Sequence, residues 1–395
     1  MRGALNPRLA ILLVWAAALL ATQAWPGIDE GIRVEFATDA SVYVPMADAS
    51  PGLPNGPIRE QHAERWVVHW LVGAAAAATG VELETAYRVA SVAAVAGVVA
   101  LLHLILAGLR LPPAAYAICL GVALASPYPF RYWLAAPGMV ADAVFGLGLA
   151  AALFGLVRSR LWLVVLGLAV ATAARQTAVP AALALAVLLS VRPLPSVTGR
   201  AARLGGAAMV AAVPLVVYAA VKAVASRFSV SDLPPLDELT VIADGPRQIA
   251  SHVGRIVLGI LFPLAALAAC ATRRVGDALG PLLLAAAIVA QPVLLTADWV
   301  DFNEPRLAGL AVPALTVALA LLIRPIRIGA ATAGVVCVAL LGGSFHHHYS
   351  RIDVGRSGWV ALTALAAIVT TVALVAARLG SEPVEREAAV AVGDG

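Results

Sequence analysis

The stretch LWLVVLGLAVATAARQTAVPAALALAVLLSV, from Leu161 to Val191, decides the topology of this chain. As one helix its 31 residues would be about 46 Å long, at about 1.5 Å per residue. A single membrane pass here would also place the downstream Arg192 and Arg200 on the outer side. We therefore expect a hairpin of two short helices, 161–176 and 178–191, that turns between Arg175 and Pro180.

The composition of the whole chain is that of a membrane protein. Of 395 residues, 61% are hydrophobic and 13% are charged, and the mean hydropathy is +0.90. Soluble domains carry about 25% charged residues. The apolar residues fall in long blocks between short charged segments and do not alternate with period 2, which favours helices over a β-barrel. The sequence predicts an all-α polytopic transmembrane bundle.

The apolar blocks predict about twelve spans with both termini in the cytoplasm. The first span follows Arg2 and Arg8, and we expect it to remain uncleaved, although a signal peptide would look similar. The later spans are expected at roughly 85–109, 114–127, 138–157, 161–176, 178–191, 204–224, 252–271, 278–297, 307–323, 328–345 and 358–378. A long outer loop, 26–84, ends in a short interfacial helix at 66–79. Residues 1–379 form one domain, and 380–395 form a disordered cytoplasmic tail.

The distribution of charge supports this orientation. The segments placed inside contain fourteen arginines and five acidic residues, as the positive-inside rule requires. Lys222 is the single lysine, and the strong arginine bias points to a GC-rich bacterial genome and hence to a bacterial plasma membrane. No basic stripe forms, so nucleic acid is excluded as a partner. The cysteines Cys119, Cys270 and Cys337 lie inside apolar blocks without metal or redox spacing.

The first outer loop contains the candidate catalytic carboxylates. Asp39 precedes Tyr43 by four residues, so both lie on one face if this stretch is helical. Asp39 is the candidate general base, with Asp29 and Glu30 as rivals. The alternative is a hydrated loop residue or a helix cap.

A second polar and aromatic group closes the same loop. His62 and Arg65 precede Trp66 and Trp70, so that an arginine to hold phosphate stands beside rings to stack on a sugar. The alternative is a belt of aromatic residues at the level of the lipid headgroups.

Ionisable residues within or beside the spans are further candidates for substrate binding. Asp142 lies at the mouth of a span, and Arg131 is its expected partner. Arg175, followed by Gln176, needs an anionic partner, which a lipid-linked phosphate, Asp142 or an outer-loop acid would supply. Arg306 opens a later span and has the guanidinium geometry that suits phosphate.

Metal and nucleotide sites receive little support from the sequence. The run His346-His347-His348 cannot converge on one ion, because consecutive helical residues point about 100° apart and only alternate residues of a strand share a side. No nucleophilic triad, GxGxxG, GxxxxGK[ST] or HExxH motif occurs. We therefore expect no metal ligands and no bound cofactor.

The arrangement resembles the GT-C class of polytopic glycosyltransferases, in particular bacterial mannosyl-, arabinosyl- and aminoarabinosyltransferases that use polyprenyl-phosphate sugars. The resemblance consists of a first span, a long acidic outer loop, an interfacial helix and a span that opens with Tyr87-Arg88. It continues through Arg131, the hairpin with Arg175-Gln176, and Arg306 before a late span. It covers about 300 residues with short motifs.

The resemblance implies transfer of a sugar, usually with inversion, from a polyprenyl-phosphate donor to a glycan, lipid or protein acceptor on the outer face. Arginines would hold the donor phosphate, an outer-loop aspartate would deprotonate the acceptor, and some members need a divalent cation. The family's paired Asp-Glu is Asp29-Glu30 here, ten residues before Asp39, so the choice of base stays open. The alternative function is a transporter or flippase for a lipid-linked or anionic substrate, with a midplane cavity lined by Asp142 and Arg175.

Overall fold

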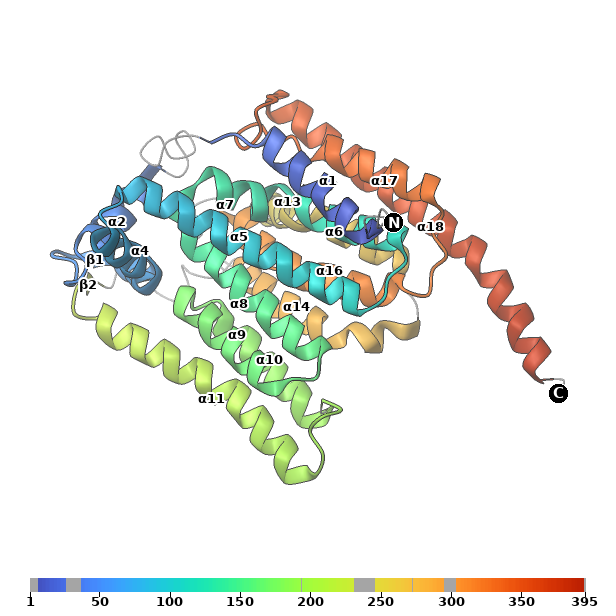
Figure 1. Ribbon diagram of the computed structural model, residues 1–395, viewed down its shortest axis with the longest axis horizontal. Helices are drawn as coiled ribbons and strands as arrows, with labels where there is room; N and C mark the ends of the chain where they lie inside the picture. The colour runs from blue at the N-terminus through green and yellow to red at the C-terminus, as the bar shows by residue number, and fades with distance from the viewer. Residues whose placement is uncertain are drawn as a thin grey trace, which may run out of the picture.

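The computed structural model describes residues 6–25, 37–192, 194–230, 246–271, 273–294 and 303–393. These residues are almost entirely helical, which confirms the all-α fold class (Figure 1). The strands found among them, β1 (Ile58–Arg59) and β2 (Ser229–Val230), form one short parallel pair. This pair ties the first loop to the segment that follows α11.

The helical elements of the described residues follow one another along the chain. In order they are α1 (Pro7–Thr22), α2 (Ala37–Asp48), α3 (Glu60–Ala63), α4 (Trp66–Thr79), α5 (Leu83–Gly108), α6 (Pro113–Ala125), η1 (Pro127–Arg131), α7 (Tyr132–Ala135), η2 (Pro137–Met139), α8 (Val140–Val157), α9 (Leu161–Ala174), α10 (Ala178–Val191), α11 (Arg200–Ala225), α13 (Pro246–Cys270), η4 (Arg273–Ala278), α14 (Leu279–Leu294), α15 (Glu304–Gly309), α16 (Val312–Ile323), α17 (Ala330–Gly343) and α18 (Gly355–Gly393).

Several of these helices are long and apolar enough to cross a membrane. Within the described ranges five pass this test: Leu83–Gly108, Pro137–Val157, Arg200–Ala225, Val275–Leu294 and Gly355–Ser381. Two bent pairs, Pro113–Ala125 with Pro127–Ala135 and Arg247–Gly259 with Leu261–Cys270, raise the number to seven if each pair is one span. A helix lies at each of the twelve predicted positions, but several have only 12 to 16 residues.

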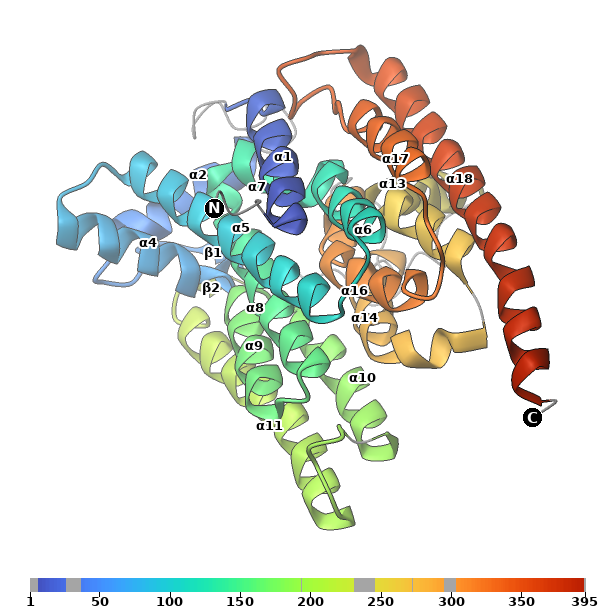
Figure 2. The ribbon, with the colours of Figure 1, turned by 45° about the vertical axis from the view of Figure 1, so that its right-hand side comes forward.

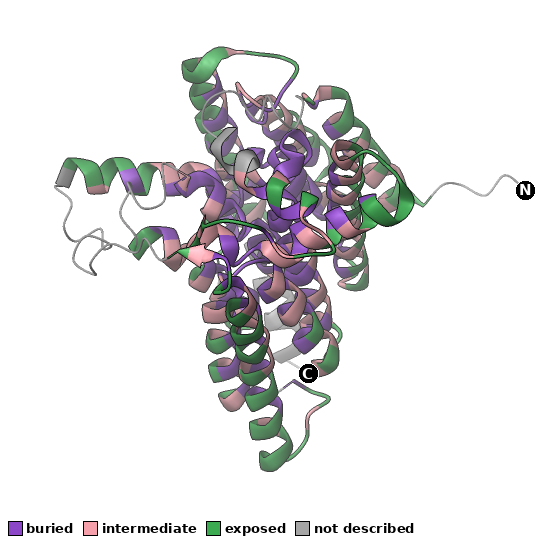
Figure 3. Ribbon diagram, turned by 90° about the vertical axis from the view of Figure 1, so that its left-hand side faces the viewer, coloured by how far each residue is buried: buried purple, intermediate pink, exposed green. Residues whose placement is uncertain are grey.

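The surface of the bundle also fits a lipid environment. Buried residues occupy the centre of the molecule, and the outer helices carry the exposed ones (Figure 3). Large apolar side chains are among the most exposed: Val14 is 68% exposed, Val187 67% and Val338 74%. Such extensive apolar exposure is unfavourable in water and marks a surface that contacts lipid or another protein. The apolar helices and the exposed apolar side chains are therefore compatible with a helical membrane protein.

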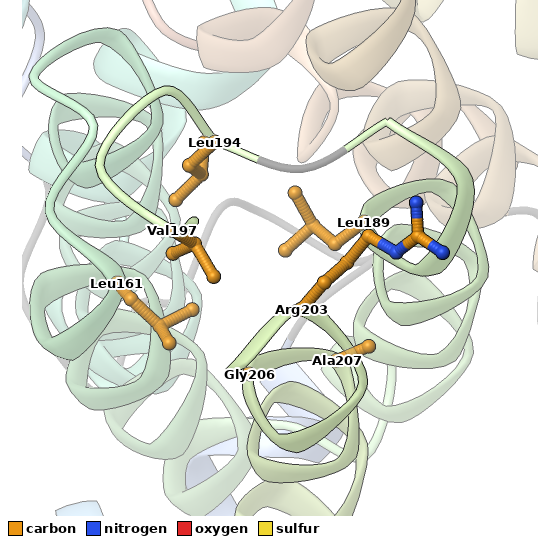
Figure 4. A pocket seen from close by; sticks show the side chains of 7 residues that line it. All are labelled: Leu161, Leu189, Leu194, Val197, Arg203, Gly206 and Ala207. Carbon is orange, nitrogen blue, oxygen red and sulfur yellow. The ribbon is translucent and has the colours of Figure 1, made fainter. Parts of the chain in front are cut away.

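The predicted hairpin is confirmed. Helix α9 ends at Ala174 and α10 begins at Ala178, with Arg175 in an extended conformation between them. Leu161 at the start of α9 and Leu189 near the end of α10 line the same pocket, so the two helices run back alongside each other (Figure 4). Arg175 interrupts the helix and lies at the turn.

Glycines bring α8 and α9 into close contact. A Cβ added to Gly148 would lie 2.5 Å from the backbone nitrogen of Ala171, and one added to Gly167 would lie 2.6 Å from the carbonyl oxygen of Gly148. Small residues at such positions allow membrane helices to approach backbone to backbone. This contact holds Asp142 on α8 close to Arg175 at the end of α9.

Helix α13 is bent where it packs against α15. Ile260 has non-helical backbone angles, and Pro263 follows three residues later, so the cause is an interrupted hydrogen-bond ladder. A Cβ on Gly259 would clash with the carbonyl of Pro305. The bend thus places the first half of α13 directly against the short helix that carries Arg306.

The two ends of the bundle contain different helices and strands. Helices α2 and α4 lie together at one end with β1 and β2, whereas α1 begins and α18 ends toward the other end (Figure 1). Helices α17 and α18 lie side by side along one edge (Figure 2). Helix α18 continues to Gly393, past residue 380, where the predicted tail begins.

Candidate functional site

A buried carboxylate lies between two arginines where α8, the α9–α10 turn and α15 meet. Asp142 Oδ2 accepts a hydrogen bond from Arg306 Nε at 2.8 Å, and Oδ1 forms an ion pair with Arg175 Nη1. All three side chains are buried. Asp142 stands in the first turn of α8, where a negative charge interacts favourably with the helix dipole. Both carboxylate oxygens are therefore engaged in holding cations.

Arg306 is fixed by its own helix and by an aromatic ring. Its guanidinium carbon lies 5.3 Å from the centre of the Tyr132 ring, within the range of a cation–π contact. Pro305 at the start of α15 has a fixed φ that suits the first turn. The helix thus presents Arg306 to Asp142 in one orientation.

A network that the sequence analysis missed anchors this helix. Glu304 Oε1 faces His252 Nδ1 at 2.9 Å and accepts from Arg255 Nε at 2.9 Å and Nη2 at 2.6 Å. His252 Nε2 lies against the carbonyl of Pro292. The first half of α13 is rich in polar residues, and this was the signal in the sequence: Arg247, Gln248, Ser251, His252 and Arg255.

Tyr43, His62 and Arg65 form the second part of the site. Arg65 Nη1 donates to the Tyr43 hydroxyl, and His62 Nδ1 lies 3.2 Å from the same oxygen. The Tyr43 ring stacks on His69 with centroids 4.1 Å apart, and Tyr87 donates to the Tyr43 carbonyl at 3.1 Å. Tyr43 is buried, and it joins α2 to α4 and α5.

The two parts of the site adjoin each other. The charge of Arg65 acts on Asp142 and on Arg175, and Tyr43 also interacts electrostatically with Arg175. Three arginines, from the residue before α4, the α9–α10 turn and α15, therefore act on one carboxylate. Guanidinium groups gathered in this way make it a candidate site for an anion.

Glu64 is a further carboxyl group beside Arg65. It accepts a hydrogen bond from the Tyr218 hydroxyl at 3.0 Å, and Lys222 Nζ lies 3.6 Å from it and 2.8 Å from Glu60. Burial raises the pKa of Glu64 above its ordinary value, against the lowering effects of Tyr218 and Lys222. This cluster joins α3 to α11 at the rim of the site.

The expected pairing of Arg131 with Asp142 is wrong. Arg131 lies at the end of η1 and donates from Nη2 to Ser344 Oγ at 3.0 Å, while its neighbour Tyr132 faces Arg306. Successive residues of a helical turn point about 100° apart, so Arg131 points elsewhere when Tyr132 faces Arg306. Gln176 contributes a buried Oε1 for which the described part of the chain offers no partner.

The predicted catalytic carboxylates fall largely outside the described residues. Asp29 and Glu30 lie outside them entirely. The backbone of Asp39 belongs to α2, one helical turn before Tyr43, and its side chain lies outside the described part.

No metal centre is found within the described ranges, where no group of three or more His, Cys, Asp or Glu residues could hold an ion. His346 Nδ1 accepts from the backbone nitrogen of His348 at 3.1 Å, and its Nε2 lies 3.2 Å from the Tyr128 hydroxyl. Burial lowers the pKa of His346 well below its usual value and that of His347 to about 4. These rings act as neutral aromatic groups.

The apolar pocket of Figure 4 is separate from this site. Leucine, valine, alanine and glycine line it together with Arg203, and it lies at the far end of the α9–α10 hairpin from Arg175. It offers no carboxylate or nucleophile. Chemistry is therefore better sought at the arginine cluster.

No protein-family model matches this chain, and neither a curated protein nor a solved structure matches it.

Proposed function

We propose that this chain is a membrane glycosyltransferase that moves a sugar from a polyprenyl-phosphate donor to a glycan, lipid or protein acceptor. The reaction takes place on the outer face of a bacterial plasma membrane. The chain crosses the membrane about twelve times with both termini in the cytoplasm, which puts α2, α4 and the arginine cluster outside.

The observation that carries this proposal is the convergence of Arg65, Arg175 and Arg306 on the single carboxylate Asp142. Arg175 and Arg306 both pair with Asp142, and the charge of Arg65 acts on it as well. Guanidinium groups suit phosphate, which accepts several of their hydrogen bonds at once. A lipid-linked phosphate is therefore the ligand that such a cluster of arginines at the end of a membrane bundle would bind.

Asp142 serves as a positioning residue in this proposal, since both of its oxygens hold arginines. The general base is Asp39, which stands on α2 one turn from Tyr43. As the acceptor oxygen bonds to the anomeric carbon, its proton passes to Asp39 and the bond from that carbon to the phosphate oxygen breaks. The arginines stabilise the charge that develops on the leaving phosphate, and the configuration inverts.

The test is transfer from radiolabelled polyprenyl-phosphate sugars in membranes that contain the full chain. Asp39→Asn should abolish transfer while the amount of folded protein stays unchanged. Arg175→Gln should weaken donor binding, because it removes one phosphate ligand. Full transfer by Asp39→Asn would move the base to Asp29 or Glu30, and absence of transfer from every donor by the wild type would contradict the proposed function.

A transporter or flippase is the second candidate, because Asp142 and Arg175 are buried polar residues within an apolar bundle. Alternating access requires a cavity near the midplane. Asp142 stands in the first turn of α8 and Arg175 in the break after α9, so both occupy helix ends. This placement favours a site reached from one face.

A further inference from the structure

Arg131 is a buried cation for which the described part of the chain supplies no carboxylate. Its side chain is 1% exposed, and Nη2 donates to Ser344 Oγ at 3.0 Å. Its Nε and Nη1 are buried and have no hydrogen-bond partner. Among the described residues no carboxylate pairs with it. A buried and unpaired guanidinium costs several kcal/mol in an apolar setting.

The surroundings hold Arg131 in place. Gln23 Nε2 donates to the Arg131 carbonyl at 3.0 Å, and Ser344 donates to the carbonyl of Leu341 at 2.7 Å, which leaves its oxygen to accept from Arg131. These contacts orient the backbone and one guanidinium nitrogen and leave two nitrogens without partners. These two nitrogens are the donors that an anion would use.

The neighbouring ring does not neutralise the charge. His346 Nδ1 accepts a backbone hydrogen bond, so its proton is on Nε2 and the ring is neutral. It stacks on Tyr349 with centroids 4.1 Å apart, and Trp359 lies 4.3 Å from it. The aromatic group around His346 therefore supplies no negative charge to Arg131.

We propose that Arg131 and Ser344 form a second oxyanion site, separate from the Arg65, Arg175 and Arg306 cluster, that binds a phosphate or carboxylate group of the acceptor. Tyr132 connects the two sites, because it follows Arg131 in the chain and packs against Arg306. Donor and acceptor anions would thus bind at neighbouring sites, one at Arg306 beside Tyr132 and one at Arg131. The assignment of this anion to the acceptor rests on the proposed function, whereas the anion site itself does not.

The test is thermal unfolding of the full chain in a neutral detergent, with phosphate or acetate added at constant ionic strength against chloride. Arg131→Met should raise the Tm without ligand, because it removes an uncompensated charge. It should also reduce the rise in Tm that phosphate or acetate causes in the wild type. The matched variant Arg306→Met should lower the Tm, because it takes a partner from Asp142.

A lower Tm of Arg131→Met without ligand, together with an unchanged response to both anions, would overturn the proposal. Ser344→Ala provides a milder variant that removes only the hydroxyl. It should weaken the phosphate response, and an undiminished response would count equally against the site. An Asp39→Asn background should retain the Arg131-dependent response, which separates this proposal from the proposed transfer reaction.

Nanodiscs identify the source of the anion. If a lipid headgroup fills the site, phosphatidylglycerol should raise the Tm relative to phosphatidylcholine, and added phosphate should have no further effect. If the anion belongs to a soluble acceptor, the phosphate response should persist in both lipids. Either result should disappear in Arg131→Met, and a result that survives this substitution would contradict the site.

Discussion

Asp142 and Arg306 are 164 residues apart in the chain, yet Asp142 Oδ2 accepts a hydrogen bond from Arg306 Nε at 2.8 Å in the buried interior. The other oxygen of Asp142 pairs with Arg175. One carboxylate thus joins α8, the α9–α10 turn and α15. Because it also sets the spacing of the arginines, its removal should affect both stability and any anion that they bind.

Asp142→Ala should destabilise the chain by about 3–5 kcal/mol, the usual cost of leaving a buried charge without its partner. Thermal unfolding in detergent should show a markedly lower Tm. The matched control is Asp277→Asn, because Asp277 is exposed in η4 and its substitution should leave the Tm unchanged. Equal effects of the two substitutions would show that the Asp142 ion pairs contribute nothing to folding.

Gly148→Ala should weaken the packing of α8 on α9, since the new Cβ would meet the backbone nitrogen of Ala171 at 2.5 Å. Overpacking of this kind costs about 1–3 kcal/mol. Gly334→Ala on α17 is the matched control: nothing lies within 4 Å of its Cβ, and alanine favours the helix by about 1 kcal/mol. Thermal unfolding should therefore move in opposite directions for the two variants.

The positions of the helices could be predicted from the sequence better than the contacts of the charged residues. Apolar blocks mark the helical segments because lipid requires a continuous hydrogen-bonded helix, and the α9–α10 hairpin and helix α4 occur where they were expected. The number of spans is harder to predict, because short helices such as α16 and α17 fall below the length that spans a bilayer comfortably.

The pairing of the charged residues depends on tertiary structure. Sequence proximity favoured Arg131 as the partner of Asp142, but the turn at η1 directs Tyr132 toward Arg306 and Arg131 toward Ser344. His252 and Arg255 match no motif, so the sequence alone does not predict their contacts. Their role arises only because the bend in α13 brings them to Glu304.

The His346 to His348 segment predicts a dependence of stability on pH. Burial and the neighbouring His348 lower the pKa of His347 to about 4, whereas an unfolded histidine titrates near pH 6.5. Between these values the unfolded chain binds protons that the folded chain does not, so stability should fall as the pH decreases from about 6.5 to 4.

The measurement is the Tm as a function of pH for the wild type and His347→Gln. The substitution also removes ring contacts and therefore shifts the whole curve, so the comparison concerns the slope. The variant should have a flatter curve between pH 6.5 and 4. Parallel curves would mean that His347 titrates alike in the folded and unfolded chains.

Tyr43→Phe should lower the rate of sugar transfer at limiting donor and leave the fold intact. The ring keeps its stacking on His69, whereas Arg65 loses the hydroxyl that orients its guanidinium group. Loss of one hydrogen bond to a charged group corresponds to about 1.5–3 kcal/mol, or roughly a 10- to 100-fold reduction in kcat/KM. Tyr116→Phe is the matched control, because it also removes a buried hydroxyl bonded to a histidine, His103 at 2.7 Å. If both variants lose activity equally, the effect reflects general packing; a selective loss in Tyr43→Phe places Arg65 in the site that binds the donor.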